Sequence, residues 1–403
     1  MHGSECRIAG RLSEPKWSVL QDQQMATITQ ELLDTKIIEP TTPPMPNMLS
    51  PYFHLGIALS MCYYGGAPFL VPSMILPYVS IMFPVPKPHS DAARGVLGCK
   101  SFNNFMVPRH FKMDGLHSIR TLLRAMMFMT KIDLTAAYPT CGISPRYRNY
   151  YMFRFRGKFY RYRGQVFGTT SAPRDFTVLL QPVISFLRSF GITLCILLDD
   201  IWIGAMLSAQ CAQDTQDVLI ILSFLGFVIE AKKTQLAPSQ RMEWCGTMID
   251  TVLMEFSVQT KKVHDARRNF RLARALSKSG ERMTLRRWAS VLGVMRSWQH
   301  AVFVAMLWSQ PLQRLVSRHI RHDKSCWDKL LPLPLPEVME ALDRFLSPGF
   351  HKYNGRPVRP LPIDMMTESD ASGYGAGIVQ THPLPQTEAR WHWDRSELPK
   401  HIN

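Results

Sequence analysis

Three aspartates lie within or at the end of apolar stretches of the sequence. Asp199 and Asp200 stand side by side in residues 193–203, which are otherwise mostly apolar and predict two short strands joined at the acids. Asp133 lies near the end of residues 127–134, a further apolar stretch that predicts a strand. If these strands are neighbours in one sheet, three carboxylates converge, and such hard oxygen ligands suit Mg²⁺.

The pairing of Asp199 with Asp200 has a consequence for charge. Two adjacent carboxylates repel each other, and a divalent cation is the usual compensating charge. Two such ions, about 3.5–4 Å apart, activate a hydroxyl nucleophile and stabilise a leaving phosphate group. For so short a motif, an ordinary exposed turn is the alternative to a metal site. The surrounding segments are needed to distinguish the two interpretations.

The segments around the acids carry clear secondary-structure patterns. Residues 18–40 predict a helix followed by an extended exit, and residues 81–107 predict a strand, a basic loop and another strand. Residues 150–162 predict a β-hairpin whose turn contains Arg156 and Gly157. These elements would surround the strands that carry the acids.

A helix is predicted to follow this hairpin. Ser171 is the candidate N-cap, and Pro173 suits the first turn. Pro182 is expected to kink the helix, and Gly191 to end it. The helical spacing predicts an apolar face formed by Phe176, Leu179, Leu180, Val183 and Leu187.

The composition favours a polyanionic partner. The 403 residues include 47 Lys and Arg against 31 Asp and Glu, which gives a formal net charge of +16. Phosphate contacts and counterion release make such an excess typical of nucleic-acid binding, although an anionic membrane surface fits the charge equally well. With 46% hydrophobic residues, the chain is long enough for about two to three domains.

The cysteines and the apolar segments bear on the compartment. The eight cysteines are scattered without a Cys-x-x-Cys pair, which argues against a zinc ribbon and a disulfide scaffold. Because the N-terminal segment is polar and has no apolar signal region, we expect an intracellular protein, cytoplasmic or nuclear. Residues 55–83 are strongly apolar, but their glycines and prolines break helices, so a buried or irregular insertion is expected rather than a membrane span.

The second half of the chain changes in character. Residues 254–330 predict a largely helical and basic region. A stretch rich in Pro and Leu predicts a boundary near residue 335, and a separate β-rich unit is expected to start near Met365.

Five segments follow one another in an order that resembles the palm motifs of reverse transcriptases. They are residues 131–138 (KIDLTAAY), 167–176 (FGTTSAPRDF), 197–200 (LLDD), 225–233 (LGFVIEAKK) and 244–250 (WCGTMID). Order and spacing together are far more specific than any single segment. The pattern is similar to that of retrotransposon enzymes of the LTR/DIRS type, from elements with a tyrosine recombinase. The resemblance implies an α+β fold, the right-hand polymerase with fingers, palm and thumb.

The resemblance also implies roles for individual residues. Asp133, Asp199 and Asp200 match the acids with which an RNA-directed DNA polymerase holds two Mg²⁺ or Mn²⁺ ions. Tyr138 matches the aromatic residue that excludes a ribose 2′-hydroxyl. The positions that match nucleotide-binding residues are Lys87, Arg94, Tyr138, Phe167, Gly168 and Lys233. Those that match the primer grip are Trp244, Cys245, Gly246 and Thr247. The implied partners are an RNA template, a DNA primer or RNA–DNA hybrid, and dNTPs, while self-association stays open.

The last segment carries a second resemblance. Residues 367–377 (TESDASGYGAG) resemble the first hairpin of a ribonuclease H domain, with Asp370 as its first metal ligand, and residues 391–393 resemble its third strand. Because one aspartate cannot hold two metals, no ribonuclease H activity is expected of this chain. The implied divisions are residues 1–253 for fingers and palm, 254–345 for a helical thumb and connection, and 346–403 for a truncated ribonuclease H-like unit.

Some positions depart from the reverse transcriptase pattern. Leu197 stands where a tyrosine is usual, and Gly98 and Lys100 stand where the pattern has an acid and an arginine. Leucine also stands at the position of Leu197 in telomerase-type enzymes, so it does not indicate inactivation. Gly98 and Lys100 favour the alternative of a catalytically degenerate, retroelement-derived nucleic-acid-binding protein, whereas the complete set of three acids opposes it. An RNA-dependent RNA polymerase is a third hypothesis, against which Tyr138 speaks.

Overall fold

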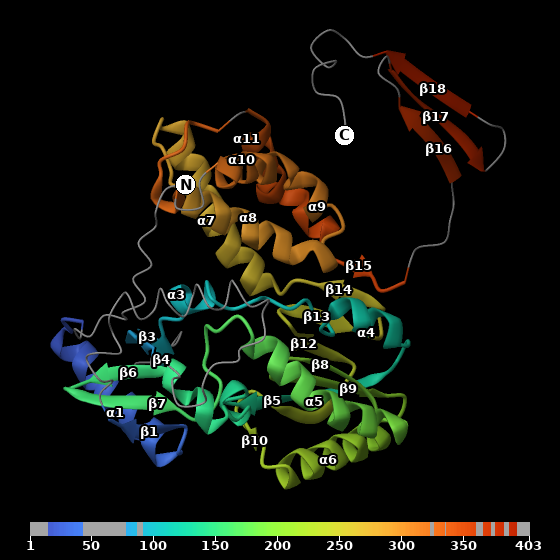
Figure 1. The fold of residues 1–403 in the computed structure, drawn as a ribbon. Coiled ribbons are helices and arrows are strands. Elements are labelled where there is room, and N and C mark those ends of the chain that lie inside the picture. Colours follow the sequence, from blue (N-terminus) through green and yellow to red (C-terminus); the bar gives the residue numbers. More distant parts are fainter. Residues whose placement is uncertain are drawn as a thin grey trace, which may run out of the picture. The chain divides into compact units, whose positions relative to one another are not determined.

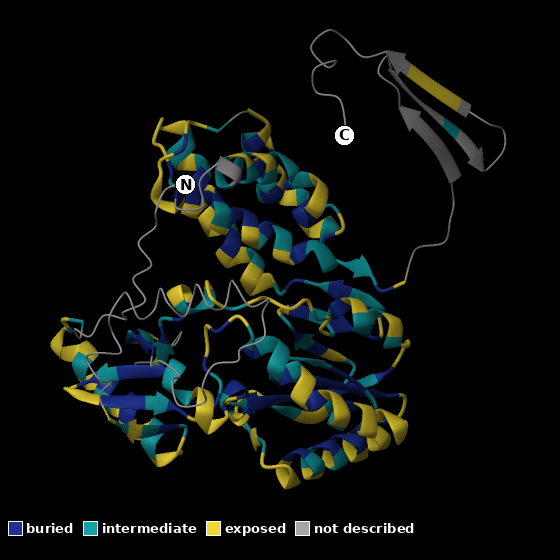
Figure 2. Cartoon of the chain, in the orientation of Figure 1, coloured by how far each residue is buried: buried dark blue, intermediate teal, exposed yellow. Residues whose placement is uncertain are grey.

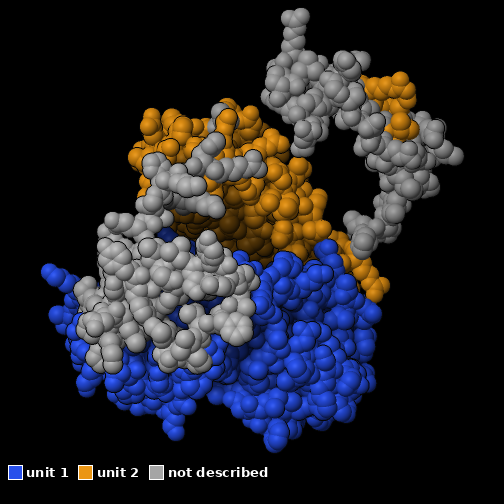
Figure 3. Space-filling model, in the orientation of Figure 1, with its two compact units in different colours: residues 1–253 blue, residues 254–403 orange. Residues whose placement is uncertain are grey.

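The chain divides into two compact units, residues 1–253 and 254–403, which are distinguished by colour in Figure 3. The computed structural model describes residues 15–42, 78–86, 92–322, 326–334, 336–359, 366–371, 375–382 and 387–392. Lys87 and most of the apolar segment 55–83 lie outside these residues. Within them, no helix combines the length and the apolar character needed to cross a membrane.

The first sheet of unit 1 has the order β1-β7-β6-β2 and is covered by helix α1 (Figure 1). Its elements are α1 (Val19–Asp34), β1 (Ile38–Thr41), β2 (Val79–Ser80), β6 (Met152–Phe155) and β7 (Lys158–Tyr162). A capping box between Ser18 and Gln21 starts α1. Arg156 and Gly157 both have positive φ, 47° and 76°, as a two-residue hairpin turn requires. The predicted helix with its extended exit and the predicted hairpin are therefore confirmed.

A separate two-stranded hairpin and two short helices lie between β2 and β6 in the chain. They are β3 (Met82–Pro86), β4 (Ala93–Leu97), α3 (Lys100–Asn103) and α4 (Leu116–Leu122). The hairpin packs against α1, with Met82 and Leu97 buried beside Ile28. Arg94 lies in β4, opposite Val85 of β3.

The central sheet of unit 1 has the order β10-β5-β9-β8, with β11 also paired to β5. Its strands are β5 (Phe128–Thr135), β8 (Thr193–Leu197), β9 (Asp200–Ala205), β10 (Val228–Ile229) and β11 (Gln235–Ser239). The strands predicted to carry the acids are confirmed, and β5 and β9 are direct antiparallel neighbours.

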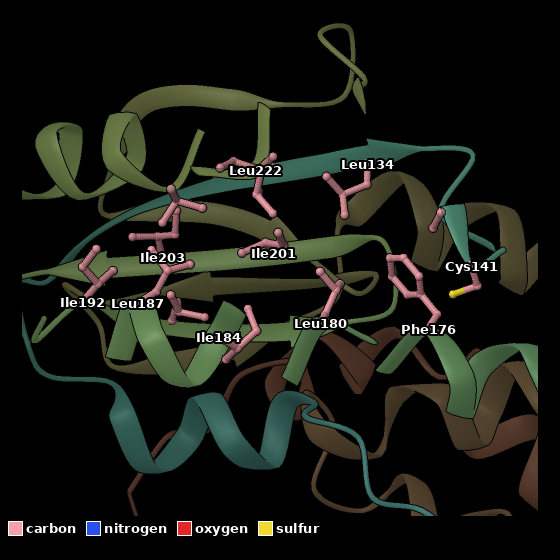
Figure 4. Close-up of a cluster of buried hydrophobic side chains, with 14 of the residues drawn as sticks. Leu134, Cys141, Phe176, Leu180, Ile184, Leu187, Ile192, Ile201, Ile203 and Leu222 are labelled. Carbon is pink, nitrogen blue, oxygen red and sulfur yellow. The ribbon is translucent and has the colours of Figure 1, made fainter. Parts of the chain in front are cut away.

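Helices α5 (Ala172–Ser189) and α6 (Ser208–Phe224) cover one face of this sheet. Figure 4 shows Leu180, Ile184 and Leu187 of α5 against Ile201 and Ile203 of β9. Figure 2 shows buried strands beneath helices whose outer faces are exposed. Two helices packed on one face of an antiparallel sheet are typical of an α+β fold.

The details of α5 correct two sequence predictions. Ser171 occupies the N-cap position, but its backbone is helical and its side chain accepts no capping hydrogen bond. Leu179 is exposed. The buried face of the helix runs through Phe176 and Leu180, which are four residues apart, and Leu179 lies beside this face rather than on it. The helix continues through Pro182, which is exposed, so the carbonyl that loses its hydrogen bond lies on the solvent side. The predicted end is confirmed, with Gly191 at a φ of 83°.

Unit 1 ends with the hairpin of β12 (Arg241–Trp244) and β13 (Thr247–Asp250). Its two-residue turn consists of Cys245 and Gly246, with φ angles of 49° and 78°. Two successive positive φ angles are the mark of the tight hairpin turns that match strand twist.

Unit 2 contains a helical bundle built around an aromatic core. Its elements are β14 (Glu255–Ser257), α7 (Thr260–Lys278), α8 (Leu285–Ser297), α9 (Ala305–Trp308), α10 (Gln310–His322), α11 (Pro336–Leu346) and β15 (Arg356–Pro357). The rings of Phe270, Trp298, Phe345 and Phe350 contact one another in its centre. The predicted helical character is confirmed.

The boundary expected near residue 335 does not divide this bundle. Helix α11 packs against α7 and α10, and Arg267 donates hydrogen bonds to the carbonyls of Phe345 and Ser347. Beyond α11, Val358 donates to the carbonyl of Met254, 2.8 Å away. The segment after the Pro-Leu stretch therefore packs with the helices before it, and it supplies Phe345 and Phe350 to the aromatic core.

Three antiparallel strands follow, β16 (Met366–Ala371), β17 (Gly375–His382) and β18 (Thr387–His392). The predicted hairpin and third strand are present. Asp370 lies in β16 opposite Gly377, and its side chain lies outside the described part of the structure.

Candidate active site

The register of the central sheet brings the three acids together. Asp133 of β5 is the direct cross-strand partner of Asp200 of β9. Asp199 precedes Asp200 in the turn, and its carbonyl accepts a hydrogen bond of 2.9 Å from the backbone N–H of Leu134. Leu198 in the same turn has a φ of 57°, a conformation that costs a non-glycine residue about 1–2 kcal/mol. The turn that presents Asp199 is therefore held in a strained backbone conformation.

The backbone on both sides of Asp133 is fixed by the segment that follows α6. The N–H of Asp133 donates to Thr234 Oγ1 at 3.1 Å, and the carbonyl of Asp133 accepts from the N–H of Glu230 at 2.8 Å. The same segment supplies Lys233, whose Nζ lies 3.2 Å from Asp133 Oδ1. Burial alone would lower the pKa of Lys233, but the hydrogen bond to Asp133 and the negative charge of Asp133 raise it overall.

The acids perturb one another electrostatically. Burial raises the pKa of both Asp199 and Asp200, and the negative charge of Asp133 raises both further. The positive charge of Lys233 acts in the opposite direction on both. The three carboxylates thus lie close enough together that a full set of negative charges is unfavourable.

The donor set fits a hard divalent cation, since all three side chains offer carboxylate oxygens and their mutual repulsion calls for a positive charge. Among the described residues, His, Cys, Asp and Glu side chains do not form a preassembled group of three metal ligands. Instead, Lys233 supplies the positive charge on Asp133. Metal binding at these acids would therefore require Asp133 to exchange its contact with Lys233 for one with the metal.

The raised pKa values have a consequence for stability. A carboxyl group with a folded-state pKa above its unfolded value contributes stability below the unfolded pKa and loses it as the pH rises through the folded pKa. At neutral pH without metal, the ionised Asp199 therefore destabilises the fold. We expect Asp199→Asn to raise the melting temperature of the metal-free chain at neutral pH by a few degrees, as measured by calorimetry.

This stability gain should shrink as the pH falls through the raised pKa of Asp199, because the wild-type carboxyl then regains its proton. Added Mg²⁺ should stabilise the wild type more than the variant. A melting temperature of Asp199→Asn equal to or below that of the wild type at neutral pH would show that the carboxylates do not strain the fold.

A cavity of about 790 Å³ opens beside the acids within unit 1. Its lining includes Asp133 and Asp199 together with Lys233 and, from the β3–β4 hairpin, Arg94. Phe167 lines the same cavity and is 42% exposed. The cavity thus combines two carboxylates with basic groups and an aromatic ring, a combination suited to a nucleotide and its phosphates.

Tyr138 lies next to this cavity in the fold. Its ring centroid is 4.8 Å from that of Phe167 and 6.1 Å from that of Phe176. Burial raises the pKa of its hydroxyl, and the charge of Asp199 raises it further, so the hydroxyl stays protonated near the acids. The ring is only 9% exposed and is held between its aromatic neighbours.

The loop that carries Phe167 is fixed by a residue that sequence reasoning missed. Asn103 Nδ2 donates to the carbonyl of Gly168 at 2.7 Å, and the N–H of Thr170 donates to Asn103 Oδ1 at 3.0 Å. Gly168 has a φ of 104°, which favours glycine at this position. The side-chain amide of Asn103 thus holds both sides of the loop. The sequence around Asn103 carries no pattern that predicts this contact.

The β12–β13 hairpin brings its turn close to the acids. Trp244 and Thr247 are buried beside the turn, and Cys245 is half-buried within it. Burial, followed by the negative charge of Asp200, raises the pKa of Cys245 to about 12. The structure therefore groups these residues with the acids, whereas Lys87 and the side chain of Asp370 lie outside the part it describes.

Residues 85–249 match the family model of reverse transcriptases, the RNA-dependent DNA polymerases. This stretch contains the three acids, Arg94, Tyr138, Phe167, Lys233 and the β12–β13 turn. No curated protein sequence matches the chain.

Solved structures with a similar fold include three foamy viral protease-reverse transcriptases. One, described as dRH in complex with double-stranded DNA, has a TM-score of 0.63 and 16% sequence identity over 97% of this chain and 60% of that one. A second, with double-stranded DNA, has a TM-score of 0.60 and 15% identity over 96% and 69%. A third, with an RNA/DNA hybrid, has a TM-score of 0.56 and 16% identity over 93% and 51%.

At such identities the likeness concerns the fold. The chain spans about 60% of the length of the first of these proteins. The α+β class is confirmed, and the fold resembles that of a reverse transcriptase polymerase. The division into fingers, palm and thumb, and the ribonuclease H-like unit, stay predictions.

Proposed function

We propose that the chain is an RNA-directed DNA polymerase of a retrotransposon, similar to the LTR/DIRS type. The observation that carries this proposal is the register that pairs Asp133 with Asp200, with Asp199 in the adjoining turn. Asp133 and Asp199 line one cavity with Arg94 and Lys233, and all three acids lie in the stretch that matches the reverse transcriptase family model. The foamy viral proteins of similar fold were solved with double-stranded DNA and with an RNA/DNA hybrid, which supports nucleic-acid partners.

In the proposed reaction, Asp133, Asp199 and Asp200 would hold two Mg²⁺ or Mn²⁺ ions. When bound, these ions activate the primer 3′-hydroxyl and stabilise the leaving pyrophosphate. Among the groups of the chain itself, Arg94 offers a planar fork and Lys233 a point charge to the triphosphate, and Lys87 is assigned the same role. Lys233 contacts Asp133 and lines the same cavity, so it would lie beside the incoming phosphates.

The remaining residues would select and align the substrates. Phe167 and Gly168 would lie under the incoming base, and the ring of Tyr138 below its sugar would favour deoxynucleotides. The turn formed by Trp244, Cys245, Gly246 and Thr247 would hold the primer end near Asp200. The implied substrates are an RNA template, a DNA primer and dNTPs.

A primer-extension assay on an RNA template tests this proposal, first with dNTPs and then with NTPs. Extension with dNTPs supports it, and extension with NTPs alone would instead indicate an RNA polymerase. Gly98 and Lys100 cannot form the salt bridge that an acid and an arginine make, which favours a degenerate binding protein as the second candidate. Template binding without any extension would establish that second candidate.

We further propose that the helices of unit 2 hold the duplex through its phosphates. The segment from Lys261 to Arg296 carries exposed basic residues on α7 and α8, among them Lys262, Arg268 and Arg271. Neutralising about five phosphates releases counterions, so the affinity should fall roughly tenfold to a thousandfold between low and physiological salt. Fluorescence anisotropy with duplexes of two unrelated sequences measures this dependence.

The affinities for the two sequences should agree, because phosphate contacts carry no sequence information. Double substitution of Arg268 and Arg271 by glutamine should reduce the salt dependence. An affinity that ignores salt, or that strongly prefers one sequence, would contradict this role of the helices.

A further inference from the structure

Strand β8 lies at an edge of the central sheet, as far as the described strands extend, and it leads directly into the turn with Asp199 and Asp200. An edge strand presents unpaired backbone N–H and C=O groups. In an antiparallel ladder, residues two apart point these groups toward the same side. Leu194 and Ile196 are such a pair, and the carbonyl oxygen of Leu194 and the N–H of Ile196 are two of the groups that they point outward.

Two side chains from outside the sheet occupy this edge. Arg188, in the last turn of α5, donates from Nη2 and Nε to the carbonyl of Leu194 at 2.9 and 3.3 Å. Asp114, just before α4, accepts from the N–H of Ile196 through Oδ2 at 3.3 Å. The pair thus offers one donor and one acceptor at the spacing at which a further strand would offer its backbone groups.

The two side chains also hold each other. Arg188 Nη2 lies 2.8 Å from Asp114 Oδ2, and the hydroxyl of Ser118 donates to Asp114 Oδ1 at 3.2 Å. Charge-assisted hydrogen bonds of this kind are shorter and stronger than neutral ones. The ion pair is therefore anchored to α4 and α5 and grips β8 between them.

We propose that Asp114 and Arg188 form a clamp that replaces a missing strand and positions the Asp199–Asp200 turn. Ile196 is three residues before Asp199, and Leu197 is the cross-strand partner of Asp200, so movement at the clamped edge reaches the acids directly. The strained Leu198 in this turn persists only if the strands around it are firmly held. Both residues are positioning residues that act through β8, and the inference rests on the proposed polymerase function.

Hydrogen exchange and single-turnover kinetics of the full chain test the clamp. In Asp114→Ala and Arg188→Leu, amide exchange in residues 193–200 should quicken about tenfold or more, because the edge loses its partners. The rate of addition at saturating dNTP should fall roughly ten- to a hundredfold, as expected when reacting groups lose their alignment. The KM for dNTP should stay unchanged, and the Mg²⁺ concentration for half-maximal rate should rise.

Conservative and matched variants separate positioning from general stability. Asp114→Asn keeps an oxygen that can accept from Ile196, so it should retain more of the rate than Asp114→Ala. Arg156→Leu breaks a similar pair, Arg156 Nη2 to Asp22 Oδ2 at 2.7 Å, and should change neither exchange in residues 193–200 nor the rate.

The outcomes distinguish the clamp from the polymerase proposal. Unchanged exchange in residues 193–200, or faster exchange with an unchanged rate, overturns the clamp. A wild-type chain that extends no primer overturns the polymerase proposal before any variant is compared, and with it the positioning role.

Discussion

Asp199→Asn is expected to abolish nucleotide addition while leaving template binding nearly intact. The substitution keeps the shape of the side chain but removes one of three charges that would hold the metal ions. Those ions supply several kcal/mol of charge stabilisation. At about 1.4 kcal/mol for each factor of ten, the rate should fall by roughly a thousandfold or more. Single-turnover extension on an RNA template measures the rate, and anisotropy measures binding.

The control for this experiment is the same substitution at Asp217, an acid on α6 that bonds to Gln213 and lies outside the cavity. Asp217→Asn should extend primers at the wild-type rate. Because Asp199→Asn is expected to be more stable than the wild type without metal, its inactivity could not be attributed to unfolding. Extension by Asp199→Asn at the wild-type rate would remove Asp199 from the site and weaken the polymerase assignment.

The acid group was predictable from the sequence because its neighbourhood is local and apolar. The apolar runs on both sides of Asp199 and Asp200 predicted the β8–β9 hairpin, and the run before Asp133 predicted β5. Alternation along a strand then determines which side chains share a face. The sequence did not predict that β5 and β9 are neighbours. The structure shows that they are, with Asp133 directly opposite Asp200.

The contacts that hold this group were not predictable, since they join segments distant in the sequence. Thr234 supports Asp133 across about a hundred residues, and Asn103 fixes the loop at Gly168. Asp114 and Arg188 meet only because α4 and α5 both approach the edge of β8. No local propensity or periodicity records such pairings.

The predictions that were wrong, for the Pro-Leu stretch and for Leu179, also failed because of contacts with distant segments. The Pro-Leu stretch near residue 335 has the composition of a linker, yet α11 returns to complete the aromatic core around Phe345. Leu179 fits an apolar helical face by spacing, but the sheet buries the stripe through Leu180. Packing partners, rather than sequence patterns, decide which of two neighbouring stripes is covered.

Tyr138→Val is expected to let ribonucleotides into the growing strand. The ring of Tyr138 is held between Phe167 and Phe176, so it cannot easily move aside for a 2′-hydroxyl. Valine would leave space where the proposed site places the sugar. Because steric selection by one group is worth about ten- to a hundredfold, the preference for dNTP over NTP should fall by roughly that factor. Single-nucleotide incorporation with matched dNTP and NTP pairs measures it as a ratio of kcat/KM values.

Two comparisons make the result of Tyr138→Val specific. Tyr138→Phe keeps the ring and loses only the hydroxyl, so its discrimination should equal that of the wild type. Removing most of a buried ring costs about 3–5 kcal/mol of stability, so melting curves must first show that the valine variant is folded at the assay temperature. If the folded valine variant rejects ribonucleotides as strongly as the wild type, Tyr138 serves the packing of Phe167 and Phe176, and the selection against the 2′-hydroxyl lies elsewhere in the cavity.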